Sequence, residues 1–154
     1  SCAITPYTHL HCYLNIPDTS GRDSLFQAES RRCKEILDKI SDEKEEKHFC
    51  IFDELYSGTN PEEATKAGTA FLKYLENYKN VDFILTTHYI NVCKKFKSSQ
   101  STKNYKMNVT INKDGTFVYH YKIKKGISKI KGATRVLKDM DYPDEIINSI
   151  ENYK

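Results

Sequence analysis

The distribution of apolar and polar residues predicts alternating strands and helices along the first part of the chain. Residues 10–15 alternate in polarity, as in a half-buried strand, and Pro17 with the polar turn after it ends the pattern. From residue 24 to about residue 39, apolar side chains recur at helical spacing. Either Asp23 or Ser24 can cap the first turn of this predicted helix.

Two later segments are continuously apolar, and a predicted helix separates them. They are residues 49–52 and residues 81–87, and strands buried on both faces of a parallel sheet have this character. The helix begins with Asn60, a capping residue, and Pro61, which suits the first helical position. The order strand, helix, strand predicts a crossover between parallel strands. The predicted inner stripe of the helix consists of Ala64, Ala67, Phe71, Tyr74, Leu75 and Tyr78.

The remainder of the chain has a different pattern. Residues 107–112 and 116–123 alternate around an Asn-Lys-Asp-Gly sequence, which predicts a β-hairpin. Two short helices are expected after Gly126, the first over residues 132–140 and the second from Tyr142 onward. The predicted fold class is therefore α/β with parallel strands, a β-hairpin and a C-terminal helix-turn-helix.

Composition narrows the class of protein. The chain has 154 residues, of which 38% are hydrophobic and 29% charged, enough for one domain with a core. No apolar run approaches the ~18 residues of a membrane span, and the first residues have no pattern from which we would expect a secretory leader. The net charge of +3 does not by itself indicate nucleic-acid binding. The cysteines, 5 in number, lack paired metal-ligand spacing, so we expect an intracellular, reducing environment, in cytoplasm or nucleus.

The candidate chemistry lies where the two buried strands end. Asp53 and Glu54 follow the first apolar run, and His88 follows the second. Since parallel strands end on the same edge of a sheet, we expect the three side chains at one crevice, where open α/β sheets bind ligands. In such a pair the aspartate can hold Mg²⁺ and the glutamate can activate a water molecule. The alternative is an acidic pair on the surface of a strand end.

The order and the amino-acid sequences of these motifs resemble those of a divergent branch of the MutS family of DNA mismatch-repair ATPases. Residues 49–61 match the family's Asp-Glu-Leu-x-x-Gly-Thr segment, and residues 86–89 match its Thr-His-Tyr segment. Residues 20–29 are similar to its signature loop. In one alignment Ser24 matches the signature serine and Asp23 is an extra residue; in the other Asp23 falls on the serine and Ser24 on the neighbouring threonine.

The resemblance implies a role for each motif in an ABC-type P-loop NTPase half-domain that binds ATP and Mg²⁺. Asp53 would hold Mg²⁺, Glu54 would be the general base, and His88 would contact the γ-phosphate. Ser24, at a helix N-terminus, would donate to the γ-phosphate held by the partner subunit. The loop linking the two sites across the dimer interface would consist of Ser57, Gly58 and Thr59.

A phosphate-binding Gly-x₄-Gly-Lys-Ser/Thr loop does not occur in the sequence. We therefore expect residues 1–125 to be the C-terminal part of a MutS-type ATPase domain, with the loop upstream or on another polypeptide. Residues 126–154 would be a helix-turn-helix dimerisation appendage. The segment alone is expected to be inactive.

The expected function is that of a dimeric, Mg²⁺-dependent ATPase module of a mismatch-repair or recombination protein, with DNA bound by domains outside this segment and no membrane contact. Two alternatives stay open: the head of another ABC-type chromosome-maintenance ATPase, and a catalytically silent dimerisation module. A weaker pattern, His9 and His11 on one face of a predicted strand, could bind a metal, although no third ligand is near.

Overall fold

The computed structural model describes residues 3, 5–14, 16, 24–113, 115–130 and 132–152. The chain forms two compact units, Ser1–Tyr105 and Lys106–Lys154. The expected boundary after residue 125 separates family domains rather than compact units, and it stays a prediction.

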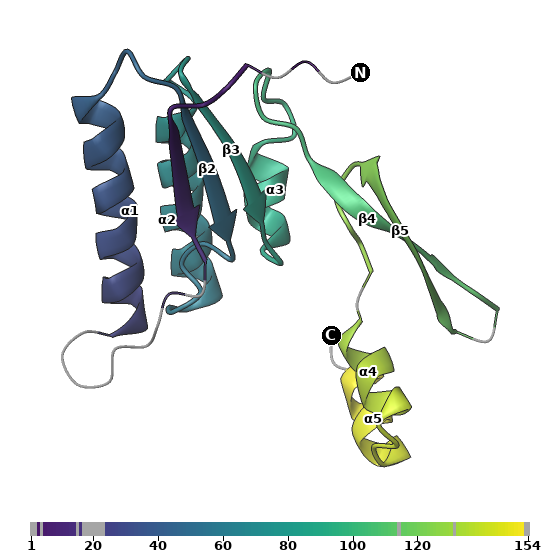
Figure 1. Cartoon of the computed structure of the whole chain (residues 1–154). Helices are drawn as coiled ribbons and strands as arrows, with labels where there is room; N and C mark the ends of the chain where they lie inside the picture. Colours follow the sequence, from purple (N-terminus) through teal and green to yellow (C-terminus); the bar gives the residue numbers. More distant parts are fainter. Residues whose placement is uncertain are drawn as a thin grey trace. The chain divides into compact units, whose positions relative to one another are not determined.

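The first unit is a parallel sheet of three strands with helices against one face (Figure 1). The sheet has the order β1-β2-β3, and both neighbouring pairs are parallel. The predicted parallel crossover is therefore confirmed. The strands are β1 (His9–Tyr13), β2 (His48–Asp53) and β3 (Val81–Thr86), and the helices are α1 (Leu25–Asp42), α2 (Pro61–Leu75) and α3 (Ile90–Lys95).

The two long helices begin at residues whose side chains accept backbone N–H groups. Ser24 Oγ accepts the Gln27 N–H at 3.3 Å, and Gln27 Oε1 accepts the Ser24 N–H at 2.7 Å, which forms a capping box at α1. Asn60 Oδ1 accepts the N–H groups of Glu62 and Glu63 at 3.1 and 3.0 Å. Caps of this kind stabilise a helix by about 1 kcal/mol. They fix the residue at which each helix starts.

The helices cover the sheet face to which His11 and Tyr13 of β1 contribute, together with alternate residues of β2. On the opposite face Leu10 is 70% exposed and Ile84 is 56% exposed. Phe52 lies at the centre of the covered face, where its ring meets the Phe71 ring edge-on at 5.4 Å. Complete burial of such a side chain contributes about 1.5–3 kcal/mol. The core therefore lies between β2 and the helices.

One part of the predicted α2 stripe is wrong. Tyr74 is 47% exposed, and its hydroxyl hydrogen-bonds that of Tyr78 at 2.9 Å outside the core. Leu72 and Gly68 occupy the buried positions instead. The difference is one of helical phase: a stripe through residues 64, 68, 71, 72 and 75 faces the sheet, and residue 74 falls outside this stripe.

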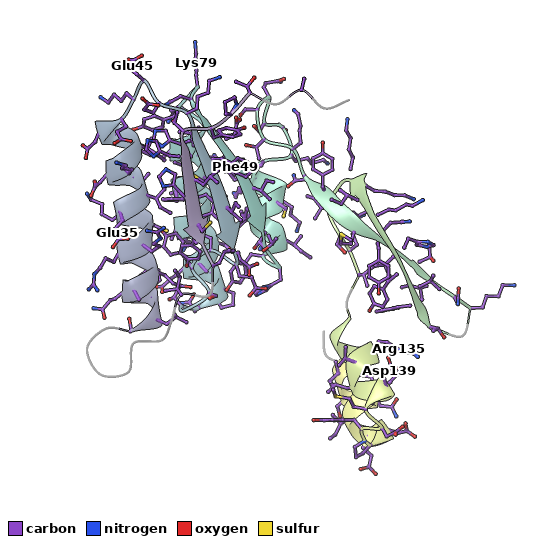
Figure 2. The ribbon with its side chains drawn as sticks, in the orientation of Figure 1. Glu35, Glu45, Phe49, Lys79, Arg135 and Asp139 are labelled. Atoms are coloured by element: carbon purple, nitrogen blue, oxygen red, sulfur yellow. The ribbon has the colours of Figure 1, made fainter. Side chains whose placement is uncertain are left out.

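The second unit contains all of β4 (Tyr105–Ile111) except its first residue, together with β5 (Phe117–Lys125), α4 (Ala133–Asp139) and α5 (Asp144–Asn152). The predicted hairpin is present: β4 and β5 pair, and Asn112 N–H donates to Thr116 O at 2.9 Å across the turn. Figure 2 labels Arg135 and Asp139 on α4, whose Nε and Oδ1 atoms lie 2.7 Å apart. In the residues that the structure describes, no helix has the length and apolar character needed to cross a membrane.

Candidate functional site

Polar side chains gather where β2 and β3 end. The Glu54 N–H donates to Thr86 O at 3.0 Å, which continues the parallel pairing one residue past β2. The Thr86 hydroxyl donates to the Asp53 carboxylate. His88 Nδ1 lies 3.1 Å from Glu54 Oε1. The structure thus brings the three predicted residues, Asp53, Glu54 and His88, to one edge of the sheet.

This edge is open to solvent. The side chains of Glu54 and His88 are 52% and 61% exposed, and Asp53 is exposed as well. An exposed ion pair contributes about 0–1 kcal/mol to stability. The contact between His88 and Glu54 is therefore not required to hold the fold together, and its groups are accessible to a ligand.

The backbone after β2 adopts an unusual conformation that directs the Glu54 side chain. Glu54 and Tyr56 have φ angles of 51° and 60°, in the left-handed region that side-chain-bearing residues rarely occupy. The surrounding core holds this turn in place: Leu55 and Tyr56 are buried, and the Tyr56 N–H donates to Tyr13 Oη at 3.2 Å. Burial of these two side chains leaves Glu54 pointing outward beside His88.

The sequence analysis gave no role to Glu29, yet this residue connects the turn to α1. The residue is 1% exposed, and its carboxylate accepts both the N–H and the hydroxyl of Ser57. It also accepts the N–H of Gly58. Thus Ser57 and Gly58, predicted to act across a dimer interface, contact α1 of their own chain.

The other predicted residues lie at helix starts. Ser24 is the N-cap of α1, where its oxygen acts as an acceptor and its own O–H proton is not used in the capping box. Thr59 Oγ1 donates to Glu63 Oε2 at 2.9 Å at the start of α2. Asp23 and the rest of the predicted signature loop before it lie outside the described residues, so both alignments of this loop stay open.

The donor set at the edge fits Mg²⁺ bound together with a nucleotide. Within the described ranges, no three His, Cys, Asp or Glu side chains converge as a metal site by themselves. Mg²⁺ does not need such a cage, because it is commonly held by one or two carboxylates, water and substrate phosphates. Asp53 offers an exposed carboxylate, of which the Thr86 hydroxyl engages one oxygen, Oδ1.

The fold and the site define an α/β protein whose candidate site lies at the carboxyl edge of parallel strands. Residues 1–154 match the family described as MutS domain V. The chain belongs to the MutS family.

Two similar proteins are both named Endonuclease MutS2. The protein from Fusobacterium nucleatum subsp. nucleatum is 30% identical over 130 residues, which cover 84% of this chain and 16% of the relative. The protein from Finegoldia magna is 29% identical over 127 residues, which cover 82% of this chain and 15% of the relative. The chain thus spans only a small part of the length of these relatives.

Proposed function

We propose that this chain is part of the ATP-binding and ATP-hydrolysing module of a MutS-type DNA mismatch-repair or recombination protein. The observation that carries the proposal is the contact of Glu54 with His88 beside Asp53, at the carboxyl edge of a parallel sheet. Family membership supports it, because the same residues match MutS domain V. The family match also favours a MutS-type protein over the head of another ABC-type chromosome-maintenance ATPase.

Glu54 is the proposed general base. Its exposed carboxylate can take a proton from a water molecule positioned for attack on the γ-phosphate. The carboxylate of a general base can only accept, so His88 donates its Nδ1–H to Glu54 Oε1, 3.1 Å away, and restricts the rotation of the carboxylate. Because Nδ1 is used in this way, Nε2 at the other side of the ring is the atom available to the γ-phosphate.

Asp53 is the proposed Mg²⁺ ligand. The Thr86 hydroxyl orients the Asp53 carboxylate through Oδ1, and Oδ2 is then the oxygen offered to the ion. When bound, Mg²⁺ would neutralise negative charge on the phosphates. The phosphate-binding loop, which these 154 residues do not contain, would come from another part of the protein or from a second polypeptide.

The N-terminus of α1 is the proposed contact to the nucleotide of a partner subunit. Free N–H groups and the helix dipole favour an anion at this position. The Ser24 hydroxyl stands at this end of α1 and can donate to a γ-phosphate oxygen. In this scheme the protein acts as a homo- or heterodimer, to which α4 and α5 contribute, and DNA binds to other domains.

The test is the stabilisation of the natural protein that contains this chain by ATP with Mg²⁺. At a nucleotide concentration about 100 times Kd, binding adds about 2.7 kcal/mol and raises the melting temperature. The Asp53→Asn variant should lose most of the Mg²⁺-dependent part of this shift. Glu35→Gln, on an exposed side chain labelled on α1 in Figure 2, is the matched control and should behave like the wild type.

A folded wild-type protein that shows no shift with Mg²⁺ and ATP, and no ATP turnover, would overturn this proposal. That result would favour the alternative of a silent dimerisation module.

A further inference from the structure

The buried carboxylate of Glu29 uses both of its oxygens on a single turn of the chain. Oε1 accepts the N–H and the hydroxyl of Ser57, both at 2.9 Å, and Oε2 accepts the N–H of Gly58 at 3.0 Å. These donors are neutral groups, although charged side chains are rarely buried without an ionic partner. An apolar residue would fill the same position on α1 without this requirement. The contact to the turn is therefore what accounts for a glutamate at this position.

The turn also packs closely against α1, in addition to its hydrogen bonds with Glu29. A Cβ atom added at Gly58 would lie 2.7 Å from Leu25 Cγ and 2.7 Å from the backbone nitrogen of Phe26. Real Cβ atoms do not approach other atoms this closely, so any side chain here would displace the backbone of α1. The first turn of α1 thus packs directly on the turn that contains Gly58.

The turn held by Glu29 is the same one that carries Glu54. Leu55 and Tyr56, both buried, separate Glu54 from the residues that Glu29 contacts. Glu54 and Tyr56 both have left-handed backbone conformations. The hydroxyl of Tyr13 accepts the Tyr56 N–H and also interacts with the Glu29 carboxylate. Glu29 and Tyr13 therefore secure the turn from two elements, α1 and β1.

We propose that Glu29 is a positioning residue for ATP hydrolysis. It fixes the N-terminus of α1, with Ser24, relative to the turn that presents Glu54, so that both parts of the site move as one body. The N-terminus of α1 would contact the nucleotide of the partner subunit, whereas Glu54 acts on the nucleotide of its own subunit. Glu29 would thereby couple the two nucleotide sites of a dimer. This inference rests on the proposed function.

The first experiment measures the contact without reference to ATP. Glu29→Gln keeps the shape of the side chain but replaces one acceptor oxygen with an NH₂ group, which cannot accept an N–H. Hydrogen exchange followed by mass spectrometry, on peptides that cover residues 54–60 of the natural protein, should show about tenfold faster exchange in this variant. Glu35→Gln, the same change at an exposed site on α1, should leave exchange at the wild-type rate. Unchanged exchange in Glu29→Gln would overturn the inference.

The second experiment measures steady-state ATP turnover per folded protein. We expect Glu29→Gln to lower kcat about tenfold while KM for ATP changes less than about twofold, since chemistry rather than binding depends on the turn. A residue that only stabilised the fold would lower the melting temperature and leave kcat per folded protein unchanged. A wild-type kcat in a variant with a loosened turn would contradict the positioning role.

A milder variant guards against misfolding and tests the path of the effect. Ser57→Ala removes one of the donors to Glu29, and we expect a few-fold fall in kcat. If Ser57 acts through Glu29, the kcat of the double variant should be no lower than that of Glu29→Gln alone. If the two reductions in kcat multiply instead, the coupling between Ser57 and Glu29 is overturned. Absence of turnover in the wild type would overturn the proposed function itself, an outcome distinct from wild-type turnover that the variants do not alter.

Discussion

Two clusters of histidine and glutamate stand at opposite edges of the same sheet, and they differ in nearly every physical respect. At the carboxyl edge His88 meets Glu54, and both side chains are more than half exposed. At the amino edge, on the side where Figure 2 labels Glu45 and Lys79, His48 is 0% exposed and His11 is 8% exposed. The same residue types thus serve a buried structural cluster at one end and an accessible candidate site at the other.

Hydrogen bonding explains how the amino-edge cluster tolerates burial. His11 Nε2 and His48 Nδ1 lie 2.9 Å apart, and His48 Nε2 lies 3.0 Å from the backbone oxygen of Glu43. The ring of His9 stacks on that of His48 at 4.9 Å. Because both ring nitrogens of His48 have partners within the cluster, His48 has no free nitrogen for a metal ion, and the described residues contain no three-ligand metal site.

Burial, followed by the positive charges that His48 and His9 can carry, lowers the pKa of His11 to about 4. His11 is therefore neutral near pH 7, and its role in the cluster is structural. Histidines stand at both edges of the sheet. A histidine can take part in a binding site only where its ring nitrogens are accessible. This contrast can be tested by changing one cluster at a time.

The largest expected effect is on the carboxyl edge. Glu54→Gln, in the natural protein with Mg²⁺ and ATP, should keep nucleotide binding and lower turnover by roughly 10²–10⁴-fold, because the amide cannot take the proton of the attacking water. Its melting temperature should match that of the wild type, since the side chain is half exposed. Steady-state kinetics and thermal unfolding check both parts. A variant that hydrolyses ATP at the wild-type rate would remove Glu54 as the base.

The second largest effect is expected on stability, from a substitution at the amino edge. His48→Ala removes a fully buried ring and leaves the partners of both ring nitrogens unsatisfied, which should lower the free energy of unfolding by about 2–3 kcal/mol. His88→Ala is the matched control on the same sheet and should change this free energy by less than about 0.5 kcal/mol. Urea denaturation measures both variants. Equal losses would show that the two clusters do not differ as described.

The third effect is a pH dependence that only the buried cluster should cause. The folded-state pKa of His11, about 4, lies below the ordinary value of 6.5, so the unfolded chain takes up a proton first as the pH falls. The contribution of neutral His11 to stability is complete above pH 6.5 and is lost toward pH 4. The slope is at most about 1.4 kcal/mol per pH unit. Glu43, whose pKa is lowered mainly by its hydrogen bond to Lys39, stabilises the fold fully above its ordinary pKa of 4.5, so its effect is lost only below that pH.

Urea denaturation at a series of pH values between 7 and 4.5 measures this slope. His11→Gln keeps a hydrogen-bonding group but does not titrate, so its stability should depend less steeply on pH than that of the wild type. A slope that the substitution does not change would assign the acid sensitivity to other groups.

The sequence predicted the carboxyl edge better than the amino edge, for a physical reason. Continuous apolar runs identify buried parallel strands, and the residues after them must lie at one edge, which placed Asp53, Glu54 and His88 together. In β1, by contrast, polarity alternates between Leu10 and Leu14 on one side and His11 and Tyr13 on the other. The helices cover the second side, because histidine and tyrosine can be buried once their polar atoms are hydrogen-bonded.

Glu29 lies in the signature-like segment, residues 20–29, but the sequence alone did not indicate what its carboxylate contacts. A glutamate occupies an inward-facing position of an amphipathic helix. The residues that share this face follow helical spacing: Phe26, Glu29, Cys33, Ile36 and Ile40. Such a position indicates a buried carboxylate with specific partners. The partners, at Ser57 and Gly58, lie far along the chain, and no local pattern identifies them. The short α3 was not predicted either, because a helix of 6 residues has too few positions to establish a period.

The smallest effect concerns the contact between His88 and Glu54 itself and separates its two possible uses. A double-mutant cycle with His88→Ala and Glu54→Ala, read out by urea denaturation, should give a coupling free energy below about 1 kcal/mol, as for other exposed pairs.

The same cycle read out by ATP turnover should be strongly non-additive, because a histidine that orients the base has nothing to orient once the base is removed. His88→Ala alone should therefore slow turnover markedly, and it should slow Glu54→Ala much less, by the part that the contact with the γ-phosphate contributes. Fully independent effects on turnover would assign His88 to the phosphate alone, and a large coupling in stability would make the carboxyl-edge pair structural, like its counterpart at the amino edge.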